Sequence, residues 1–510
     1  MGTPDDRGLL SLAGGVLQPG FEGWSAPDWI RRRLADGLGS VLLFGRNFAP
    51  APGGREQASA LVAQLRAENP DVLVAVDEEG GDVTRLEWET GSSSPGNLAL
   101  GVVDDVDLTR AVARSIGREL AALGIDVDYA PDADVNSNPR NPVIGVRSFG
   151  ADQAVVARHA AAWVRGLQEG GTAACAKHFP GHGATVVDSH LGLPTVDADL
   201  AELSRVALPP FRAAVAAGAR ALMTAHILLP ALDPEHPATV SPRVLHDVLR
   251  RRLGFDGLVV TDAVEMRAVA DRYGCAGAAV RALAAGADLV CVGDRGSAAE
   301  YDALRSAVVR AVRTGELAEE RLAEAAGRVA AFARWARALR AGSQAAEGGP
   351  AGRAPGLAAA RRALISVRPP GAEPPTRGVP YVAELRPGTT VAVGAVTAWG
   401  LAGPLGALLP GTEVRQVGHA EAEADPAGVV ERICAAARGR PLVLVVRNAH
   451  RHGWMDATVV AVTARRPDAV VVEFGIAQSP PRGGLHVVPH GAARVCAEAA
   501  AEVVAAHLTG

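Results

Sequence analysis

The chain has 510 residues, which is too long for one ordinary hydrophobic core, so we expect two or three domains. It is 48% hydrophobic and 21% charged, with a formal net charge of −5 and no basic block, which argues against nucleic-acid binding. The 5 cysteines are scattered without a CxxC pair, which argues against a disulfide framework or a structural zinc site.

The beginning of the chain, "MGTPDDRGLL", lacks the basic region that precedes the apolar core of a signal peptide. No apolar run reaches the ~18–20 residues that a membrane-spanning helix needs. We therefore expect a cytoplasmic protein with reduced cysteines and no membrane partner.

Short apolar runs alternate with amphipathic helical stretches over the first two-thirds of the chain. In 105–123, for example, Leu108, Val112 and Leu120 share one face of a predicted helix that Gly124 would end. The repeated βα order predicts a parallel sheet, and the number of units favours a TIM-type (β/α)8 barrel over an open, doubly wound sheet. The predicted strands are 40–44, 72–77, 125–131, 173–179, 221–227, 258–263 and 288–293.

Two low-periodicity stretches follow, one rich in Gly, Ala and Arg at 337–356 and one rich in proline at 368–378. They predict a linker over 341–380 between a barrel domain at 1–340 and a smaller domain at 381–510. In the smaller domain the βα alternation resumes, which predicts a three-layer α/β sandwich. Its predicted strands are 390–396, 441–448, 468–475 and 485–491.

The densest group of ionisable residues is "KHFPGHGATVVDSHLGLP", residues 177–194, which begins at the end of a predicted strand. A solvated loop that caps the barrel would be enough to explain a single histidine. It explains a cluster of this density less well. His178 and His182 have the i, i+4 spacing of a zinc pair on a helix. The Phe-Pro-Gly between them breaks a helix, and no HExxH glutamate is present, so the sequence disfavours a metal site.

Asp188 and His190 suggest general acid/base catalysis, because a carboxylate two residues away can orient an imidazole and stabilise its protonated form. Ser189 lacks the GxSxG context of a serine nucleophile. Asp262, at the exit of the apolar strand in "GLVVTDAVEM", is either a helix N-cap or a nucleophile facing the substrate.

Eight segments of the first domain carry recognisable motifs: "LFGRN" (43–47), "DEEGGDVTRL" (77–86), "APDADVN" (130–136), "NPVIGVRSFG" (141–150), "KHFPGHG" (177–183), "DSH" (188–190), "MTAHI" (223–227) and "VVTDAVEM" (259–266). In their order along the chain, these motifs resemble those of the glycoside hydrolase family 3 β-N-acetylglucosaminidases. In two places the chain departs from the family's pattern. The family's usual DQEGG is DEEGG here, with Glu78 in place of the glutamine. Ala184 follows PGHG, at a position where the family often has an acidic residue.

The resemblance implies that Asp262 is a nucleophile that forms a covalent glycosyl intermediate and that the reaction retains configuration. His190 is implied to be the acid/base and Asp188 its orienting partner. The residues implied to bind the terminal sugar are Asp77, Arg85, Arg147, Lys177 and His178.

The implied substrate is a terminal β-linked N-acetylglucosamine, as on muropeptides from cell-wall turnover, and no metal or other cofactor is implied. Phosphorolysis is an alternative, because an imidazole that has given up its proton is neutral and does not repel phosphate. A sugar-binding protein without catalysis is a lesser alternative, since Asp262 and His190 are both present.

Overall fold

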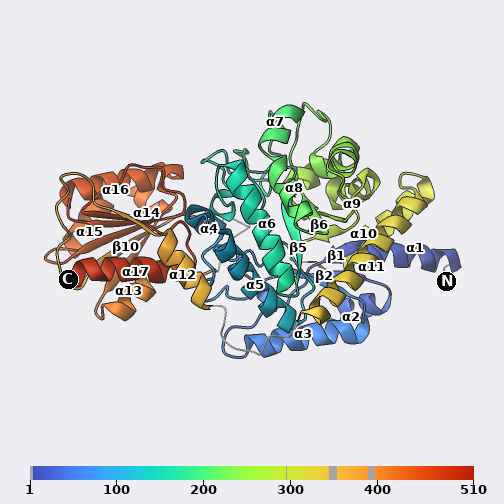
Figure 1. Cartoon of the computed structure of the whole chain (residues 1–510), viewed down its shortest axis with the longest axis horizontal. Helices are drawn as coiled ribbons and strands as arrows, with labels where there is room; N and C mark the ends of the chain where they lie inside the picture. The colour runs from blue at the N-terminus through green and yellow to red at the C-terminus, as the bar shows by residue number, and fades with distance from the viewer. Residues whose placement is uncertain (1–3, 294–295, 344–352, 389–396) are drawn as a thin grey trace. The chain divides into compact units, whose positions relative to one another are not determined.

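The computed structural model describes residues 4–293, 296–343, 353–388 and 397–510 (Figure 1). The chain divides into two compact units. The barrel unit comprises Met1–Glu79, Thr109–Ile144 and Ala151–Ala351. The sandwich unit comprises Gly80–Leu108, Gly145–Gly150 and Gly352–Gly510.

Parallel strands form the centre of the barrel unit, and β2 to β7 pair with one another in chain order. Strand β1 pairs in parallel with β8, and Val260 of β7 bridges to Leu289 beside β8. Gln18 of β1 donates a hydrogen bond to Ser40 of β2 at 2.6 Å, so the ring of strands closes, as the βα order predicted. The strands are β1 (Leu17–Pro19), β2 (Ser40–Leu43), β3 (Leu73–Val76), β4 (Val127–Asp128), β5 (Ala173–Phe179), β6 (Ala221–Thr224), β7 (Leu258–Thr261) and β8 (Val290–Val292).

Helices connect these strands, and their apolar faces are buried. In α5 (Val106–Leu123) the predicted stripe of Val112 and Leu120 is buried, and Gly124 follows with the positive φ that a helix stop favours. The other helices of the unit are α1 (Pro4–Gly15), α2 (Asp28–Ala35), η1 (Gly45–Asn47), α3 (Gly54–Glu68), α6 (Gln153–Glu169), α7 (Leu200–Arg205), α8 (Leu208–Ala216), η3 (Ala238–Val240), the π-helix η4 (Arg243–Arg252), α9 (Arg267–Ala285), α10 (Ala298–Thr314) and α11 (Glu319–Gly342).

Most barrel strands end earlier than predicted, although β5 has the predicted bounds of 173–179. The predicted strand 125–131, for example, contains only the two residues of β4. The predictions extended into the segments that leave the barrel, because apolar residues continue past the last ladder bond. Strand β1 was missed, since three residues ending in proline carry no usable periodicity.

Within the described residues, the sandwich unit contains a six-stranded sheet in the order β11-β10-β12-β13-β14-β9, which confirms the predicted three-layer architecture. All neighbours are parallel except β9, which runs antiparallel to β14. The strands are β9 (Ile365–Val367), β10 (Tyr381–Arg386), β11 (Glu413–Gly418), β12 (Leu442–Arg447), β13 (Val470–Phe474) and β14 (Leu485–Val488). The predicted strand 390–396 lies outside the described residues.

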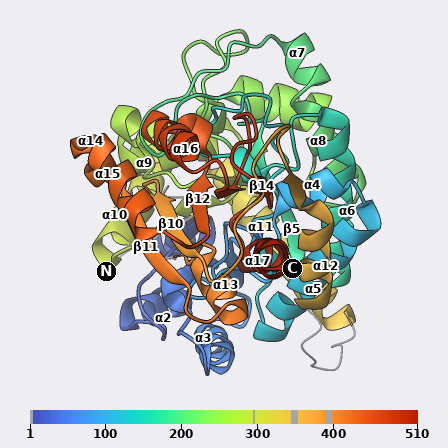
Figure 2. The ribbon, with the colours of Figure 1, turned by 90° about the vertical axis from the view of Figure 1, so that its left-hand side faces the viewer.

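Helices cover both faces of this sheet (Figures 1 and 2). Apolar residues of α13 (Ala402–Leu408) and α17 (Arg494–Thr509) form a core with alternate strand residues such as Val443 and Val470. On the opposite face α14 (His419–Ala424), α15 (Pro426–Ala436) and α16 (Gly453–Arg465) pack against Leu444 and Val471. The unit also contains α4 (Asn97–Val103), η2 (Gly145–Arg147) and η5 (Ala449–Arg451).

The predicted linker over 341–380 needs correction, because it contains α12 (Arg353–Ala363) and β9. Ala360 of α12 is fully buried in a small core with Cys496 and Ala499 of α17. An alanine-rich stretch has a weak apolar pattern, yet its small side chains allow close packing on another helix. Strand β9 is ordered by its backbone pairing with β14, which makes it one edge of the sheet.

Segments 80–108 and 145–150, which were predicted to belong to the barrel domain, group with the sandwich unit. The buried carboxylate of Asp82 accepts hydrogen bonds from Arg447 Nη2 and, at 2.7 Å, from the Ala492 N–H. Arg494 Nη2 donates to Glu87 Oε1 at 3.0 Å. Polar contacts of this kind join residues far apart in the chain and leave no local sequence pattern.

We expect Arg447→Ala to destabilise the sandwich unit by about 3–5 kcal/mol, because Asp82, with a side chain only 1% exposed, would lose its ion-pair partner. Arg465→Ala is the matched control in the same unit, since its pair with Glu431 is exposed and is worth about 1 kcal/mol or less. Urea unfolding followed by circular dichroism measures both. Equal losses in the two variants would contradict the role of the buried pair.

Candidate active site

The candidate site is built from side chains that follow the carboxyl ends of neighbouring barrel strands. Asp77 comes after β3, Lys177 and His178 lie near the end of β5, and Asp262 comes directly after β7. His226 lies just past the end of β6. Parallel strands present their carboxyl ends at one face of a barrel, so the fold gathers these side chains there.

Lys177 lies between two carboxylates. Its Nζ is 2.6 Å from Asp77 Oδ1 and 2.6 Å from Glu79 Oε1. Lys177 and Glu79 are buried, whereas Asp77 is partly exposed. Two carboxylates around one ammonium leave a net negative charge, and the exposed part of Asp77 can accept hydrogen bonds from a sugar hydroxyl.

The buried Asp134 holds two parts of the histidine-rich segment. Its Oδ2 is 2.7 Å from His178 Nδ1, and its Oδ1 accepts the backbone N–H of His182 at 2.5 Å. Burial alone would raise the pKa of Asp134, but the two histidines outweigh this effect and lower it. The Lys177–His178 peptide bond is cis.

Asp188 and His190, which were predicted to act together in acid/base catalysis, contact each other. Asp188 Oδ1 lies 2.7 Å from His190 Nδ1 and also accepts the His190 backbone N–H at 2.9 Å. Burial would raise the pKa of Asp188, but the hydrogen bonds from His190 lower it below the ordinary value. Asp188 is buried and the His190 ring is partly exposed, so the imidazole can be oriented by the carboxylate and still reach a ligand.

Asp262 is held as an anion. Burial alone would raise its pKa, but the imidazoles of His226, His178 and His190 lower it, and its Oδ1 accepts the Ala263 N–H at 2.8 Å. An ionised carboxylate at the exit of a barrel strand is chemically suited to nucleophilic attack.

His226 contacts the backbone next to Asp262. Burial is the largest influence on its pKa and lowers it, despite the opposing charge of Asp262. Its Nε2 lies 3.0 Å from the Ala263 carbonyl oxygen, which can only accept, and its Nδ1 lies 2.8 Å from the Thr239 hydroxyl. The ring therefore fixes the backbone beside Asp262.

Within the described residues, Asp132, Asp134 and His178 offer ligand atoms within 4.8 Å of one another. His178 Nδ1 is already hydrogen-bonded to Asp134, so a metal ion would have to replace that bond. The same geometry is also that of a carboxylate, Asp134, that orients the imidazole of His178.

Arg85 and Arg147, the remaining predicted sugar ligands, lie in segments of the sandwich unit. Arg147 ends η2, is buried, and its carbonyl accepts a hydrogen bond from Asn97 Nδ2 at 2.6 Å. The side chain of Arg85 is partly buried, and in the sequence Arg85 lies between Asp82 and Glu87. Their part in sugar binding stays a prediction.

The contacts that Glu79, Asp134 and His182 make with other residues of the site were not predicted from the sequence. Glu79 and Asp134 belong to quoted motifs, "DEEGG" and "APDADVN", and polar residues just after barrel strands were the available signal. The ring of His182 contacts Thr185 and Ser189, a pairing that the spacing alone does not reveal.

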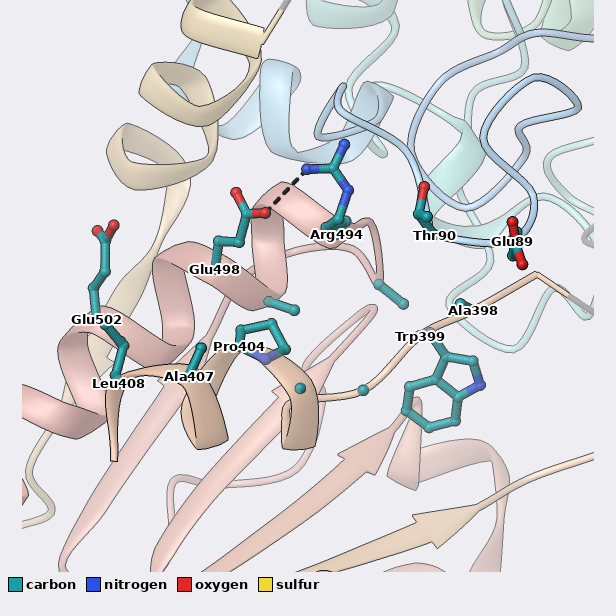
Figure 3. Close-up of a pocket in the computed structure, with 14 residues that line it drawn as sticks. Glu89, Thr90, Ala398, Trp399, Pro404, Ala407, Leu408, Arg494, Glu498 and Glu502 are labelled. Carbon is teal, nitrogen blue, oxygen red and sulfur yellow. Dashed lines mark hydrogen bonds and ion pairs between the residues drawn. The ribbon is translucent and has the colours of Figure 1, made fainter. Parts of the chain in front are cut away.

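A pocket of about 610 Å3 lies in the sandwich unit, lined by residues of α13, α17 and the segment at 89–90 (Figure 3). Three of its charged lining residues are paired within the protein, since Arg494 Nη1 donates to Glu498 at 3.0 Å and Glu502 pairs with Arg361. The guanidinium of Arg386 covers the ring of Trp399, with its Cζ 4.2 Å from the ring centroid. We therefore place the chemistry in the barrel unit.

The amino-terminal part of the chain matches a family model over residues 28–332, that of the glycosyl hydrolase family 3 N terminal domain. The chain belongs to glycoside hydrolase family 3. This membership confirms the resemblance inferred from the motifs.

Curated relatives agree with this membership. Beta-hexosaminidase A of Pseudoalteromonas piscicida is 35% identical over 315 residues, 58% of this chain and 52% of its own length. The chain thus spans about half the length of that relative. A beta-hexosaminidase of Chromobacterium violaceum is 39% identical over 291 residues, 56% of this chain and 80% of its own length.

Among solved structures, a glycoside hydrolase family 3 beta-N-acetylglucosaminidase from Paenibacillus sp. str. FPU-7 has a TM-score of 0.84 at 32% identity. The match covers 98% of this chain and 97% of that chain, so it includes the sandwich fold as well as the barrel. In the part of the chain that the structure describes, none of the helices combines the length and apolar character that a bilayer crossing requires.

We expect the stability of the protein to fall as pH decreases from 6.5 to about 4, because His182 is buried as a neutral ring. Burial lowers the pKa of His182 from 6.5 to about 4. Between these values the unfolded chain binds a proton that the folded chain does not, so acid favours unfolding. The contribution of His182 is about 3 kcal/mol. Urea unfolding across this range tests it, and His182→Gln should weaken the dependence; an unchanged slope would contradict the assignment.

Proposed function

We propose that the protein is a retaining, exo-acting β-N-acetylglucosaminidase. The observation that carries this proposal is the combination of an anionic Asp262 after β7 with an imidazole, His190, oriented by the buried carboxylate of Asp188. A retaining glycosidase needs a nucleophile and a proton donor, and these groups can supply both functions.

In the first step, His190 donates a proton to the glycosidic oxygen while a carboxylate oxygen of Asp262 attacks the anomeric carbon. The bond to the leaving group breaks as the glycosyl–aspartate bond forms, and the aglycone departs as an alcohol. Asp188 stabilises the imidazolium before transfer and holds the ring through its Nδ1.

In the second step, the now neutral His190 takes a proton from water, and the oxygen of this water attacks the anomeric carbon. The ester bond to Asp262 breaks and the carboxylate is regenerated. Two displacements at the same carbon return the original configuration.

We assign recognition of the sugar to Asp77, Lys177 and His178. Lys177 supplies N–H donors and the partly exposed Asp77 supplies acceptors, which suits the hydroxyls of a terminal N-acetylglucosamine. Muropeptides from cell-wall turnover in the cytoplasm are the proposed natural substrates. The mechanism needs only the side chains named above, with no cofactor.

We expect Asp262→Ala to lower turnover by more than about 10⁴-fold, since the variant lacks the nucleophile. Asp271→Ala is the matched control: it lies on α9 and its ion pair with Arg267 is exposed. Release of the aglycone from an aryl β-N-acetylglucosaminide measures both. Substantial activity in Asp262→Ala would refute the assignment.

His190→Ala should lower turnover of an alkyl β-N-acetylglucosaminide by about 10²–10⁴-fold and that of an activated aryl glycoside by much less. The reason is that a good leaving group departs without protonation. Equal losses on both substrates would show that His190 is not the acid.

Phosphorolysis is a second candidate, favoured by the imidazole acid/base, which carries no negative charge when an incoming phosphate would attack the glycosyl–Asp262 ester. Product analysis of a defined muropeptide with and without phosphate distinguishes the two reactions. We expect free N-acetylglucosamine in both cases. A sugar 1-phosphate as the dominant product at millimolar phosphate would reverse the ranking.

A further inference from the structure

The loop that carries the acid/base pair, residues 184–194, makes few apolar contacts near Asp188 and His190. Val186 and Leu191 are each 64% exposed, and Val187 is 40% exposed. Burial of apolar side chains is the usual force that fixes a segment. It does not fix the tip of this loop, so polar contacts must hold the pair in place.

Ser189, between the two members of the pair, is the anchored residue of the loop and is only 2% exposed. Its hydroxyl lies 3.1 Å from His182 Nε2, and its carbonyl accepts the Ala268 N–H at 3.2 Å. Ala268 lies in the first turn of α9, where backbone N–H groups have no partner inside the helix. Ser189 thus ties the loop to the helix that follows Asp262.

His182 is a firm anchor for this hydroxyl. Its ring is buried, its Nδ1 lies 2.8 Å from Thr185 Oγ1, and its backbone N–H donates to Asp134. The next residue, Gly183, has no room for a side chain, since a Cβ there would lie 1.9 Å from the Val135 carbonyl oxygen. A neutral imidazole has one donor and one acceptor, which matches two hydroxyl partners.

We propose that Ser189 is a positioning residue that, through His182 and Ala268, sets where the Asp188–His190 pair stands relative to Asp262. This inference rests on the proposed glycosidase function. Removing the hydroxyl would let the loop tip move and would reduce the fraction of time in which His190 can reach the glycosidic oxygen. The loss should appear only where the leaving group needs a proton.

The test compares Ser189→Ala with Ser189→Thr, which keeps the hydroxyl, on an alkyl and an activated aryl β-N-acetylglucosaminide. We expect Ser189→Ala to lower kcat about 10–100-fold on the alkyl substrate and less than about 3-fold on the aryl substrate, with KM little changed. Ser189→Thr should recover most of the loss. Ser204→Ala is the matched control, because its hydroxyl bonds locally to the Leu200 carbonyl in α7.

His190→Ala, assayed on the same two substrates, separates failure of this inference from failure of the proposed function. If His190→Ala shows no dependence on the leaving group, the proposed acid role is wrong and Ser189 has no acid to position. If His190→Ala shows the dependence but Ser189→Ala lowers kcat equally on both substrates, or not at all, the positioning role is wrong. His182→Gln gives the same readout if Ser189→Ala does not fold.

Discussion

The candidate site depends on the buried carboxylate of Asp134. One oxygen orients the His178 ring and the other holds the backbone at His182, so a single side chain fixes both the proposed sugar ligand and the start of the loop that bears the acid/base. A buried carboxylate must have its acceptors satisfied, and these two donors meet that need. Asp134 therefore links two parts of the histidine-rich segment.

Electrostatics then divides the site into groups with different tasks. Lys177 is held between Asp77 and Glu79, and these two carboxylates fix the position of its ammonium group. Asp262 is kept anionic by neighbouring imidazoles, whereas burial keeps His182 neutral. The charge state of each group thus depends on its burial and on its partners.

The division of the chain into units does not follow the order of the sequence. Segment 80–108 leaves the barrel strands after Glu79 and packs within the sandwich unit, where Arg447 and Arg494 bind its carboxylates. The carboxyl-terminal part of the chain therefore fixes a segment that contains Arg85. The carboxyl-terminal part of the chain therefore has a structural role, because its Arg447 pairs with the buried carboxylate of Asp82.

The sequence by itself determined the βα alternation, the barrel, the sandwich and the family motifs, and it suggested the pairing of Asp188 with His190. Each rests on local periodicity or on residues close together in the chain, as in the buried stripe of α5. Only the tertiary structure decided that Asp134 joins His178 to His182, that Ser189 reaches α9, and that 80–108 belongs with the sandwich. Those contacts join residues that lie far apart in the chain or follow no helical or strand periodicity, so no local pattern predicts them. The charge states of the buried side chains also depend on burial, which exists only in the folded protein.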